Sequence, residues 1–446
     1  MSNFLNKAFG FETGKHNVRT EILAGVTTFL TMAYILAVNP SIFSELKEMP
    51  GGAVFSATAL AAIAGTLMMA FYAKKPFALA PGMGLNAFFV YTICLGMGYS
   101  WQFALTAVLL EGIIFVILTV TKVRTWLITA IPGTLKKAIG AGIGLFIAFL
   151  GCQNAGIIVD SESTLVSLGK ISQGTALVAM LGLMVTAALV MLRVNGGVLI
   201  GIIVSTFIGL VVIDPATGAP VTQLARTETG FVQMISMPQS ISPIFCKFEF
   251  SQILTWDMLV VVFTLLLLDI FDTMGTIIGV YQGESMIEKD EVDDLEKMFM
   301  ADSVATICGA CLGTNTTTTY VESAAGIGAG GRTGLTAFST AVCFALALFF
   351  SPFFLSIPSA ATAPALIVVG VMMMPAVKRI QWDDFAKSIP AFLTIIVIPL
   401  SCSISDGILM GVISYVVIHA IAGRYKEISV PMWILAGLFI LRYILI

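Results

Sequence analysis

The chain has 446 residues, of which 58% are hydrophobic and 11% are charged, and its formal net charge is -3. Average soluble domains carry roughly 25% charged residues, so a water-soluble fold could not bury this much apolar surface. The slightly negative charge also argues against a nucleic-acid-binding protein, which would need a basic face.

Apolar runs of about 20 residues, the length of a membrane-spanning helix, recur through the first half of the chain. Residues 1–19 lack the short apolar core and small-residue cleavage site of a signal peptide, so we expect the N-terminus to be retained. Seven spans are predicted after it, at residues 22–42, 53–73, 77–98, 101–121, 137–158, 172–192 and 196–213.

A polar connector, residues 214–254, separates this first repeat (1–213) from a second one (255–422). An odd number of spans in each half gives the halves opposite orientations, as in the inverted repeats of secondary transporters. The tail, residues 423–446, ends in an apolar piece that could either span the membrane or lie at its surface. The spans of the second half are predicted at residues 255–281, 298–313, 316–330, 334–356, 359–376, 388–403 and 406–422.

The positions of lysine and arginine favour a cytoplasmic location for both termini, because short cytoplasmic loops carry the excess of positive charge. With this orientation, Arg442 in the tail stays unassigned and most other basic residues are cytoplasmic. We therefore predict a multi-pass protein of the cell inner (plasma) membrane with an extracellular connector. The basic residues that would face outward are Lys47, Lys170, Arg226 and Lys247.

The third span of each half should not be a continuous helix. Residues 80–84 read Ala-Pro-Gly-Met-Gly, and residues 316–331 contain four consecutive threonines followed by glycines. Proline and glycine both disfavour the interior of a helix. Interrupted segments at matching positions of two halves indicate a substrate site near the bilayer midplane, where half-helix N-termini offer free N–H donors.

Carboxylates inside the predicted spans are the main functional candidates, because a charge within the bilayer is costly. Asp269 and Asp272 lie three residues apart on one helix face. Glu322 follows the threonine run, and Glu111 lies in the fourth span. Without a basic counter-ion in a span, a buried carboxyl group could take up a proton, as a proton-coupled carrier requires. The alternative, that these acids only cap helices or hold polar neighbours, stays open and weighs most for Glu111.

The first broken span offers polar and flexible positions of its own. Asn86 can donate and accept hydrogen bonds at once, and Gly84 lets the backbone approach a ligand closely. Tyr320, Phe88 and Phe89 could stack on a planar heterocycle, or they could simply pack. A kink capped by Asn86 is the simpler alternative for this segment.

Three other patterns are not expected to carry chemistry. Residues 326–331 satisfy G-x-G-x-x-G, but they lie in an apolar span without the strand and turn of a dinucleotide site. Cys308 and Cys311 match C-x-x-C, yet the chain has only 2 histidines and no second cysteine pair, so we expect packing rather than zinc or redox chemistry. A solvated loop or an amphipathic helix explains the charged run 284–296. We therefore expect no cofactor and no metal.

Four sequence blocks together resemble a known family. The chain is similar, nearly end to end, to the nucleobase/ascorbate transporter superfamily, and within it to the azaguanine-resistance-type (AzgA-like) purine permeases. Residues after 430 extend beyond that family's pattern. The blocks are Thr31–Pro40 (TMAYILAVNP), Pro81–Phe89 (PGMGLNAFF), Asp269–Gly279 (DIFDTMGTIIG) and Thr319–Gly328 (TYVESAAGIG).

The resemblance implies an all-α polytopic membrane protein of about fourteen transmembrane segments, folded as two inverted seven-span repeats. Short β-strands would open the broken spans 3 and 10. A core domain of spans 1–4 and 8–11 would hold the substrate, and it would move against a gate domain of spans 5–7 and 12–14. The function implied is a secondary active transporter, not an enzyme, that imports guanine, hypoxanthine or adenine by proton symport and alternating access.

The family's site residues can be carried over position by position. The acids of the eighth and tenth spans fall on Asp272 and Glu322, which would bind substrate and carry the coupled proton. The polar residue of the third span falls on Asn86. The full set expected to bind substrate is Asn86, Asp272, Glu322, Tyr320, Thr276 and Gly84, with support from Asp269, Val321 and Ser323.

Several alternatives stay open from sequence. An anion carrier of the related sulfate-permease architecture would prefer an uncharged or basic site, which paired acids disfavour. A nucleobase carrier with a different base preference, or with sodium in place of protons, fits the same residues. An ion channel would need a hydrophilic pore lining or rings of like charge, and an enzyme would need a nucleophile–base pair or a metal cluster. The expected partners are a purine base, protons and the lipid bilayer; a homodimer stays open.

Overall fold

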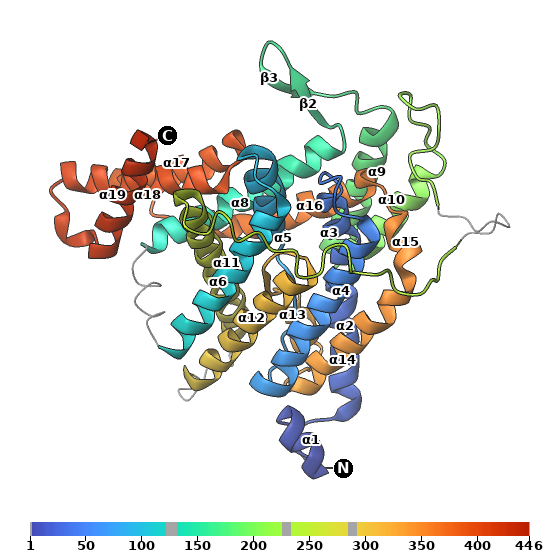
Figure 1. Ribbon diagram of the computed structural model, residues 1–446. Helices are drawn as coiled ribbons and strands as arrows, with labels where there is room; N and C mark the ends of the chain where they lie inside the picture. The colour runs from blue at the N-terminus through green and yellow to red at the C-terminus, as the bar shows by residue number, and fades with distance from the viewer. Residues whose placement is uncertain (1, 122–131, 225–232, 284–291, 446) are drawn as a thin grey trace.

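The computed structural model describes residues 2–121, 132–224, 233–283 and 292–445, and these residues are predominantly helical (Figure 1). Among them, 7 helices are long and apolar enough to cross a membrane. Shorter apolar helices follow most of the other predicted spans. The seven long segments are Val18–Phe43, Gly51–Ala73, Trp101–Val120, Gly133–Asn154, Gly174–Met191, Gly334–Leu355 and Ser359–Arg379.

The first half of the chain forms helices at nearly all of its predicted spans, and a short hairpin (β2–β3) that the sequence had not indicated. Its elements are α1 (Ser2–Phe9), α2 (Val18–Met32), α3 (Ile35–Phe43), α4 (Gly51–Met68), the π-helix η1 (Met69–Ala73), β1 (Leu79–Pro81), α5 (Met83–Ala87), the π-helix η2 (Phe88–Gly96), α6 (Trp101–Val120), α8 (Gly133–Asn154), β2 (Ile158–Ser161), β3 (Leu165–Leu168), α9 (Gly174–Met191) and α10 (Gly197–Gly209).

The second half follows an extended connector. Its elements are α11 (Trp256–Gly283), α12 (Val292–Leu312), β4 (Thr317–Thr319), α13 (Ser323–Gly328), α14 (Gly334–Ala347), η3 (Leu348–Phe350), α15 (Ser351–Leu355), α16 (Ser359–Met373), η4 (Met374–Arg379), α17 (Phe385–Ser401), α18 (Ile404–Ile421), η5 (Tyr425–Glu427) and α19 (Val430–Leu445).

Both predicted broken spans are interrupted, and both contain the expected short strand. Strand β1 pairs with β4 in antiparallel register, so that Leu79 lies opposite Thr319 and Pro81 opposite Thr317. Every residue of the two strands is buried. Pairing satisfies backbone groups that a helix would otherwise satisfy, which is the condition for irregular backbone at membrane depth. Because the pairing is antiparallel, α5 and α13 begin at opposite ends of the strand pair.

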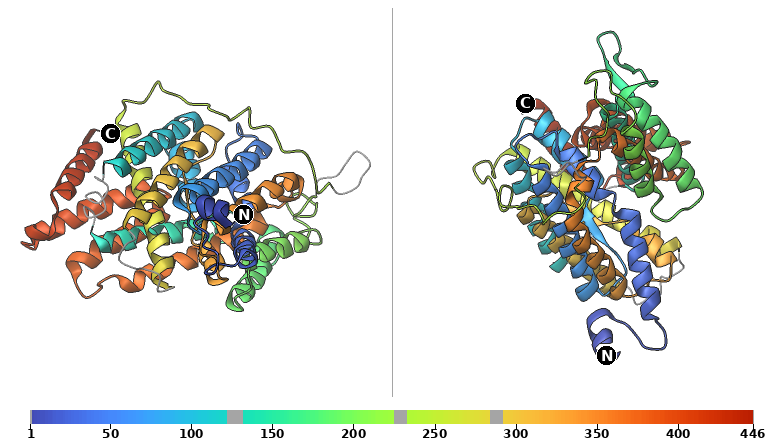
Figure 2. Two further views of the ribbon diagram at one scale, coloured as in Figure 1. Left: turned by 90° about the horizontal axis from the view of Figure 1, so that it is seen from below. Right: turned by 90° about the vertical axis from the view of Figure 1, so that its right-hand side faces the viewer.

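The helices pack in two groups. Around the strand pair, α2 contacts α14, α4 contacts α12 and α14, and α6 contacts α12. In the second group, α8 contacts α16 and α17, α9 contacts α10 and α16, and α17 contacts α18. The left-hand view of Figure 2 shows the green helices α9 and α10 and the red C-terminal helices at opposite ends of the molecule. Within the second group they are linked through α16 and α8, because α16 contacts α9 and α10 and α8 contacts α17 and α18.

Two predicted features include residues that the structure does not describe. They are the outward-facing Arg226 and residues 284–291 of the charged run. The remainder of that run belongs to α12, which begins at Val292. The undecided tail forms the helix α19, which packs on α18. Its Phe439 ring lies 6.4 Å from the ring of Phe263 in α11.

Candidate functional site

The strand pair fixes the turn that leads from β4 into α13. The backbone N–H of Tyr320 donates to the Ala78 carbonyl at 3.0 Å, and the Tyr320 hydroxyl donates to the Pro81 carbonyl at 2.6 Å. In return, the N–H of Ala78 donates to the Ser323 hydroxyl at 3.0 Å. Tyr320 and Ser323 are therefore buried positioning groups, and the residues between them are held in place.

Glu322 lies in this turn and is partly exposed. Its carboxylate accepts a hydrogen bond of 2.6 Å from the hydroxyl of Tyr34, the residue that joins α2 to α3. Thr31, from the same sequence block, donates to the Glu322 carbonyl at 3.4 Å. The neighbouring Val321 is 52% exposed, so an apolar surface lies open beside the carboxylate.

Asp272 comes to the same place from α11. Its side chain is solvent-accessible although it is surrounded by protein atoms, and it lies within electrostatic range of Glu322 and Tyr320. Tyr34 also lies within range of both carboxylates. We call the accessible carboxyl groups of Asp272 and Glu322, together with the buried Tyr34 and Tyr320 beside them, the accessible polar group. It joins both predicted acids to the predicted tyrosine.

Asp269 faces a different environment from Asp272, although the two lie on the same helix. It is fully buried and lies beside the carboxyl group of Glu111. Both Asp269 oxygens and one Glu111 oxygen lack a well-formed hydrogen bond among the described residues. A proton on either acid would supply the missing donor. The other Glu111 oxygen accepts from the Thr316 hydroxyl at 2.7 Å.

A third buried acid, Asp302 of α12, completes what we call the buried carboxyl cluster (Glu111, Asp269 and Asp302). Asp302 accepts hydrogen bonds from the hydroxyls of Thr273 at 2.9 Å and Thr319 at 3.2 Å. The threonine run thus points hydroxyl groups at these acids. The run was expected to break a helix and to open with a short strand, and it also donates hydrogen bonds to buried carboxyl groups.

Asn86 is buried in α5, and neither its amide nitrogen nor its amide oxygen has a hydrogen-bond partner among the described residues. The structure therefore does not join Asn86 to Asp272 or Glu322 through a direct hydrogen bond. A buried polar group without a partner costs roughly 1–3 kcal/mol. Asn86 keeps the capacity to bind a ligand atom or a neighbour in another conformation.

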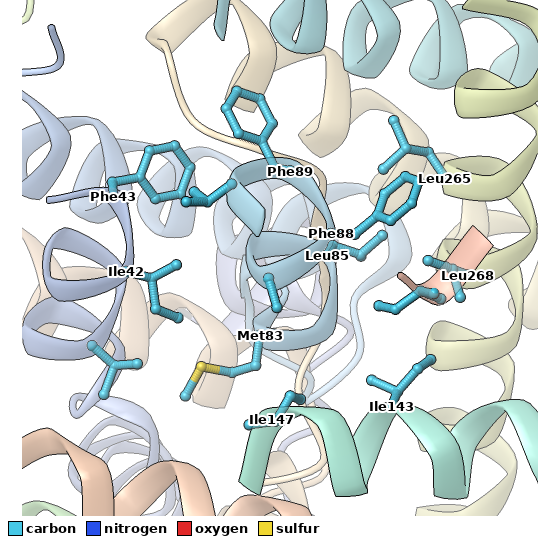
Figure 3. Close-up of a cluster of buried hydrophobic side chains, with 14 of the residues drawn as sticks. Ile42, Phe43, Met83, Leu85, Phe88, Phe89, Ile143, Ile147, Leu265 and Leu268 are labelled. Carbon is cyan, nitrogen blue, oxygen red and sulfur yellow. The ribbon is translucent and has the colours of Figure 1, made fainter. Parts of the chain in front are cut away.

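Gly84 serves helix packing in this structure. A Cβ atom at this position would lie 2.8 Å from Cγ2 of Ile143 in α8, so glycine permits the close approach of that helix. Figure 3 shows Met83 of α5 on the side of Ile147 in α8, and Leu85 beside Phe88.

The stacking interpretation of Phe88 and Phe89 is not supported, because both rings are fully buried in the apolar core of Figure 3. The ring centroids of Phe89 and Phe43 are 5.2 Å apart. Both phenylalanines thus belong to packing rather than to a ligand surface.

Thr276 lies one helical turn beyond Asp272, with its side chain buried.

Comparison with known proteins identifies the family. The sequence pattern of the Permease family (Xan_ur_permease) matches residues 19–410. The chain belongs to this family. It is 42% identical to the guanine/hypoxanthine permease PbuG of Bacillus subtilis, over 98% of each chain. It is 38% identical to the adenine permease AdeQ of Escherichia coli, over 100% of this chain and 97% of that one.

The fold also resembles the transmembrane domain of the cyanobacterial bicarbonate transporter BicA. The TM-score is 0.64 with 14% identity, and the match covers 87% of this permease and 97% of that domain. With its apolar helices, the protein is thus a multi-pass membrane transporter.

Two residues of the site had not been predicted. Asp302 lies within an apolar predicted span of this permease, so the rule that singled out the other acids would also have found it. Tyr34 belongs to the block Thr31–Pro40, but an uncharged tyrosine in an apolar segment gives no signal of its own. Only the tertiary contact with Glu322 reveals its role.

Proposed function

We propose that this permease imports purine nucleobases by proton symport, and that it belongs to the AzgA-like branch. The observation that carries the proposal is the accessible polar group, in which Asp272 and Glu322 lie within electrostatic range of each other and the side chain of Val321 is exposed. The names of its guanine/hypoxanthine and adenine permease relatives support a purine as substrate.

Carboxylates suit the edge of a purine. An ionised carboxylate accepts two hydrogen bonds side by side, and guanine offers such a pair through its ring N–H and exocyclic amino group. Tyr34 fixes the orientation of Glu322 by donating to it at 2.6 Å. The apolar side chain of Val321 can lie against the ring face. Asn86 would complete the recognition if substrate or a conformational change brought a polar atom to its unpartnered amide.

Proton coupling follows from the proximity of the two acids. Two carboxylates within electrostatic range repel each other when both are ionised, so their joint ionisation is unfavourable. A proton on Asp272 or Glu322 removes the repulsion and provides an O–H donor for a ring nitrogen or carbonyl of the base. Proton and substrate therefore favour each other's binding, which is the requirement for symport.

Alternating access would arise from the two helix groups. In this proposal the group around the strand pair is the core domain, and the group of α8–α10 and α16–α18 is the gate domain. The halves 1–213 and 255–422 would form inverted seven-span repeats with both termini cytoplasmic and the connector outside. The likeness of the fold to the BicA transmembrane domain supports a transporter architecture, and Gly84 would be the point at which α5 slides on α8.

Uptake of radiolabelled hypoxanthine, guanine, adenine, uracil and sulfate tests the proposal in cells that lack their own carriers. We expect saturable purine uptake that collapses with a protonophore and is lost in Glu322→Gln. Glu12→Gln is the matched control, since Glu12 is an exposed carboxylate that pairs with Lys15 near the N-terminus. Uptake of sulfate or uracil alone, or full activity of Glu322→Gln, would show that the site assignment is wrong.

A further inference from the structure

The described part of the connector, residues 233–254, is an extended segment that crosses the molecule (Figure 1). It is bonded to the ends of several helices around the strand pair. The N–H of Ser236 donates to the Phe349 carbonyl at 2.9 Å, and the N–H of Glu249 donates to the Thr106 hydroxyl at 2.8 Å. Ile244, between these two points, is fully buried. The segment is therefore packed on the protein along its length.

Between these contacts the connector brings Cys246 to Cys311, near the end of α12. The N–H of Cys246 donates to the carbonyl of Cys311 at 2.8 Å. A disulfide joins residues whose Cα atoms are about 4.4–6.8 Å apart, and a direct backbone hydrogen bond holds the two residues close to each other. The two thiols also lie within electrostatic range of each other. Both cysteines are reduced in the structure, and Cys246 is exposed.

The approach of the two segments is specifically built. Cys246 has a φ of 51°, in the left-handed region that non-glycine residues seldom adopt. Gly313, two residues after Cys311, has a φ of 92°, and a Cβ atom there would lie 2.7 Å from the Ile244 carbonyl oxygen. A larger residue at position 313 would push the connector away. The cysteines are thus held together by backbone geometry on both sides.

We propose that Cys246 and Cys311 form a reversible disulfide bond that fastens the connector to the end of α12. The sequence pattern Cys308–Cys311 had suggested packing alone, because the chain has only 2 histidines and no second cysteine pair. Cys308 lies one helical turn away and also near Cys311, but the backbone bond joins Cys246 to Cys311. The proposed orientation places this pair outside the cell, where disulfides persist.

The oxidant is an external disulfide, such as oxidised glutathione or a thiol-oxidising protein. The exposed Cys246 thiolate attacks one sulfur of that disulfide, and the other sulfur leaves as a thiolate. The Cys311 thiolate then attacks Cys246 in the mixed disulfide and displaces the second external thiolate. Two cysteine thiols are thereby oxidised, the external disulfide is reduced to two thiols, and the two protons end on those thiols.

The bond would join parts of one helix group, since the contacts above lie on helices around the strand pair. It should therefore stabilise that group without blocking motion against the other. We expect oxidation to raise the melting temperature by about 3 °C, because closing the loop from residue 246 to 311 restricts the unfolded chain. Purine uptake should stay within about twofold of the reduced protein, since the bond leaves the accessible polar group untouched.

The test compares a variant that retains only Cys246 and Cys311 with a control that retains only Cys246 and Cys308. Both are treated with oxidised glutathione, alkylated, reduced and labelled with a mass-tagged maleimide. We expect the first pair to oxidise and to be released by dithiothreitol, and the control pair to remain reduced. Equal oxidation of both pairs, or none of Cys246 with Cys311, would overturn the proposal.

The unmodified chain provides a second measurement that does not depend on folding of the cysteine-poor variants. Peptide mapping after oxidation should find a cross-linked peptide containing Cys246 and Cys311. The cross-link should vanish in Cys246→Ser and in Cys311→Ser but persist in Cys308→Ser. Its persistence in Cys311→Ser would assign the bond to Cys308 and refute the pairing. A membrane-impermeant thiol reagent on intact cells tests separately which side of the membrane the pair faces.

Discussion

The hydrogen bond from Tyr34 to Glu322 provides a sharp test of the site, because one oxygen atom can be removed without changing the shape of the side chain. Tyr34 is fully buried, and its hydroxyl donates to the carboxylate at 2.6 Å. A hydrogen bond to a charged group contributes about 1.5–3 kcal/mol. Each 1.4 kcal/mol corresponds to a factor of about ten in an equilibrium constant. Tyr34→Phe should therefore lower the ratio of maximal uptake rate to half-saturation concentration roughly 10- to 100-fold.

The assay is the initial rate of radiolabelled hypoxanthine uptake over a range of concentrations, normalised to the amount of protein in the membrane. Tyr91→Phe is the matched control, because its half-buried hydroxyl is bonded to Asn154 and not to a carboxylate. In the double variant Tyr34→Phe/Glu322→Gln, the two losses should not add, since both act on one hydrogen bond. Uptake by Tyr34→Phe within twofold of the parent would refute the idea that this bond positions Glu322 for substrate.

Three further predictions concern stability. Glu21→Gln should lower the free energy of unfolding by about 1–3 kcal/mol, measured by thermal melting in detergent, because the buried carboxylate accepts from the N–H groups of Arg332 and Thr333 at 3.1 and 3.2 Å; an unchanged melting temperature would contradict this. Asp302→Asn should lower the free energy of unfolding by a similar amount, because an amide NH2 group would replace a carboxyl oxygen that accepts a hydrogen bond from a threonine hydroxyl. Asp269→Asn should be neutral or stabilising, because it breaks no well-formed bond and gives Glu111 a donor; the opposite ranking of the two variants would refute the cluster geometry. The Arg424 guanidinium, 2.6 Å from Asp384, holds the pKa of that carboxyl below its ordinary value. The stabilisation from this ion pair is therefore fully present above about pH 4, the ordinary pKa of an aspartate. It is lost as the pH falls through the lower pKa that Asp384 has in the folded protein. The melting temperature of Arg424→Leu should therefore depend less on pH in that range than the melting temperature of the parent.

Local composition was enough to predict the positions of the helices and the two broken spans. Hydrophobic runs mark helices because every backbone group in a bilayer must be satisfied internally. Proline in residues 80–84 and the threonine run at 316–319 indicate interruptions of a helix, and both regions contain a short strand. The hairpin of β2 and β3 gave no comparable signal, because each of its strands has only 4 residues.

The direction that each side chain faces could not be predicted in the same way. Asp269 and Asp272 are separated by roughly 60° around the helix axis. That rotation is enough to bury one carboxyl beside Glu111 and leave the other accessible near Glu322. The difference depends on where the strand pair lies against α11, which is a property of the tertiary structure and not of the sequence block.

The same limit explains why the contact between Cys246 and Cys311 was not predicted. The pattern Cys308–Cys311 contains only neighbours on one helix, whereas Cys246 belongs to a connector whose path no periodicity predicts. The contact depends on a backbone hydrogen bond and on the absence of a side chain at Gly313. Replacing Gly313 with valine should therefore separate the connector from α12 and abolish the cross-link between Cys246 and Cys311, even though both thiols remain. Such a result would show that chain geometry, rather than the reactivity of the cysteines, selects the pair.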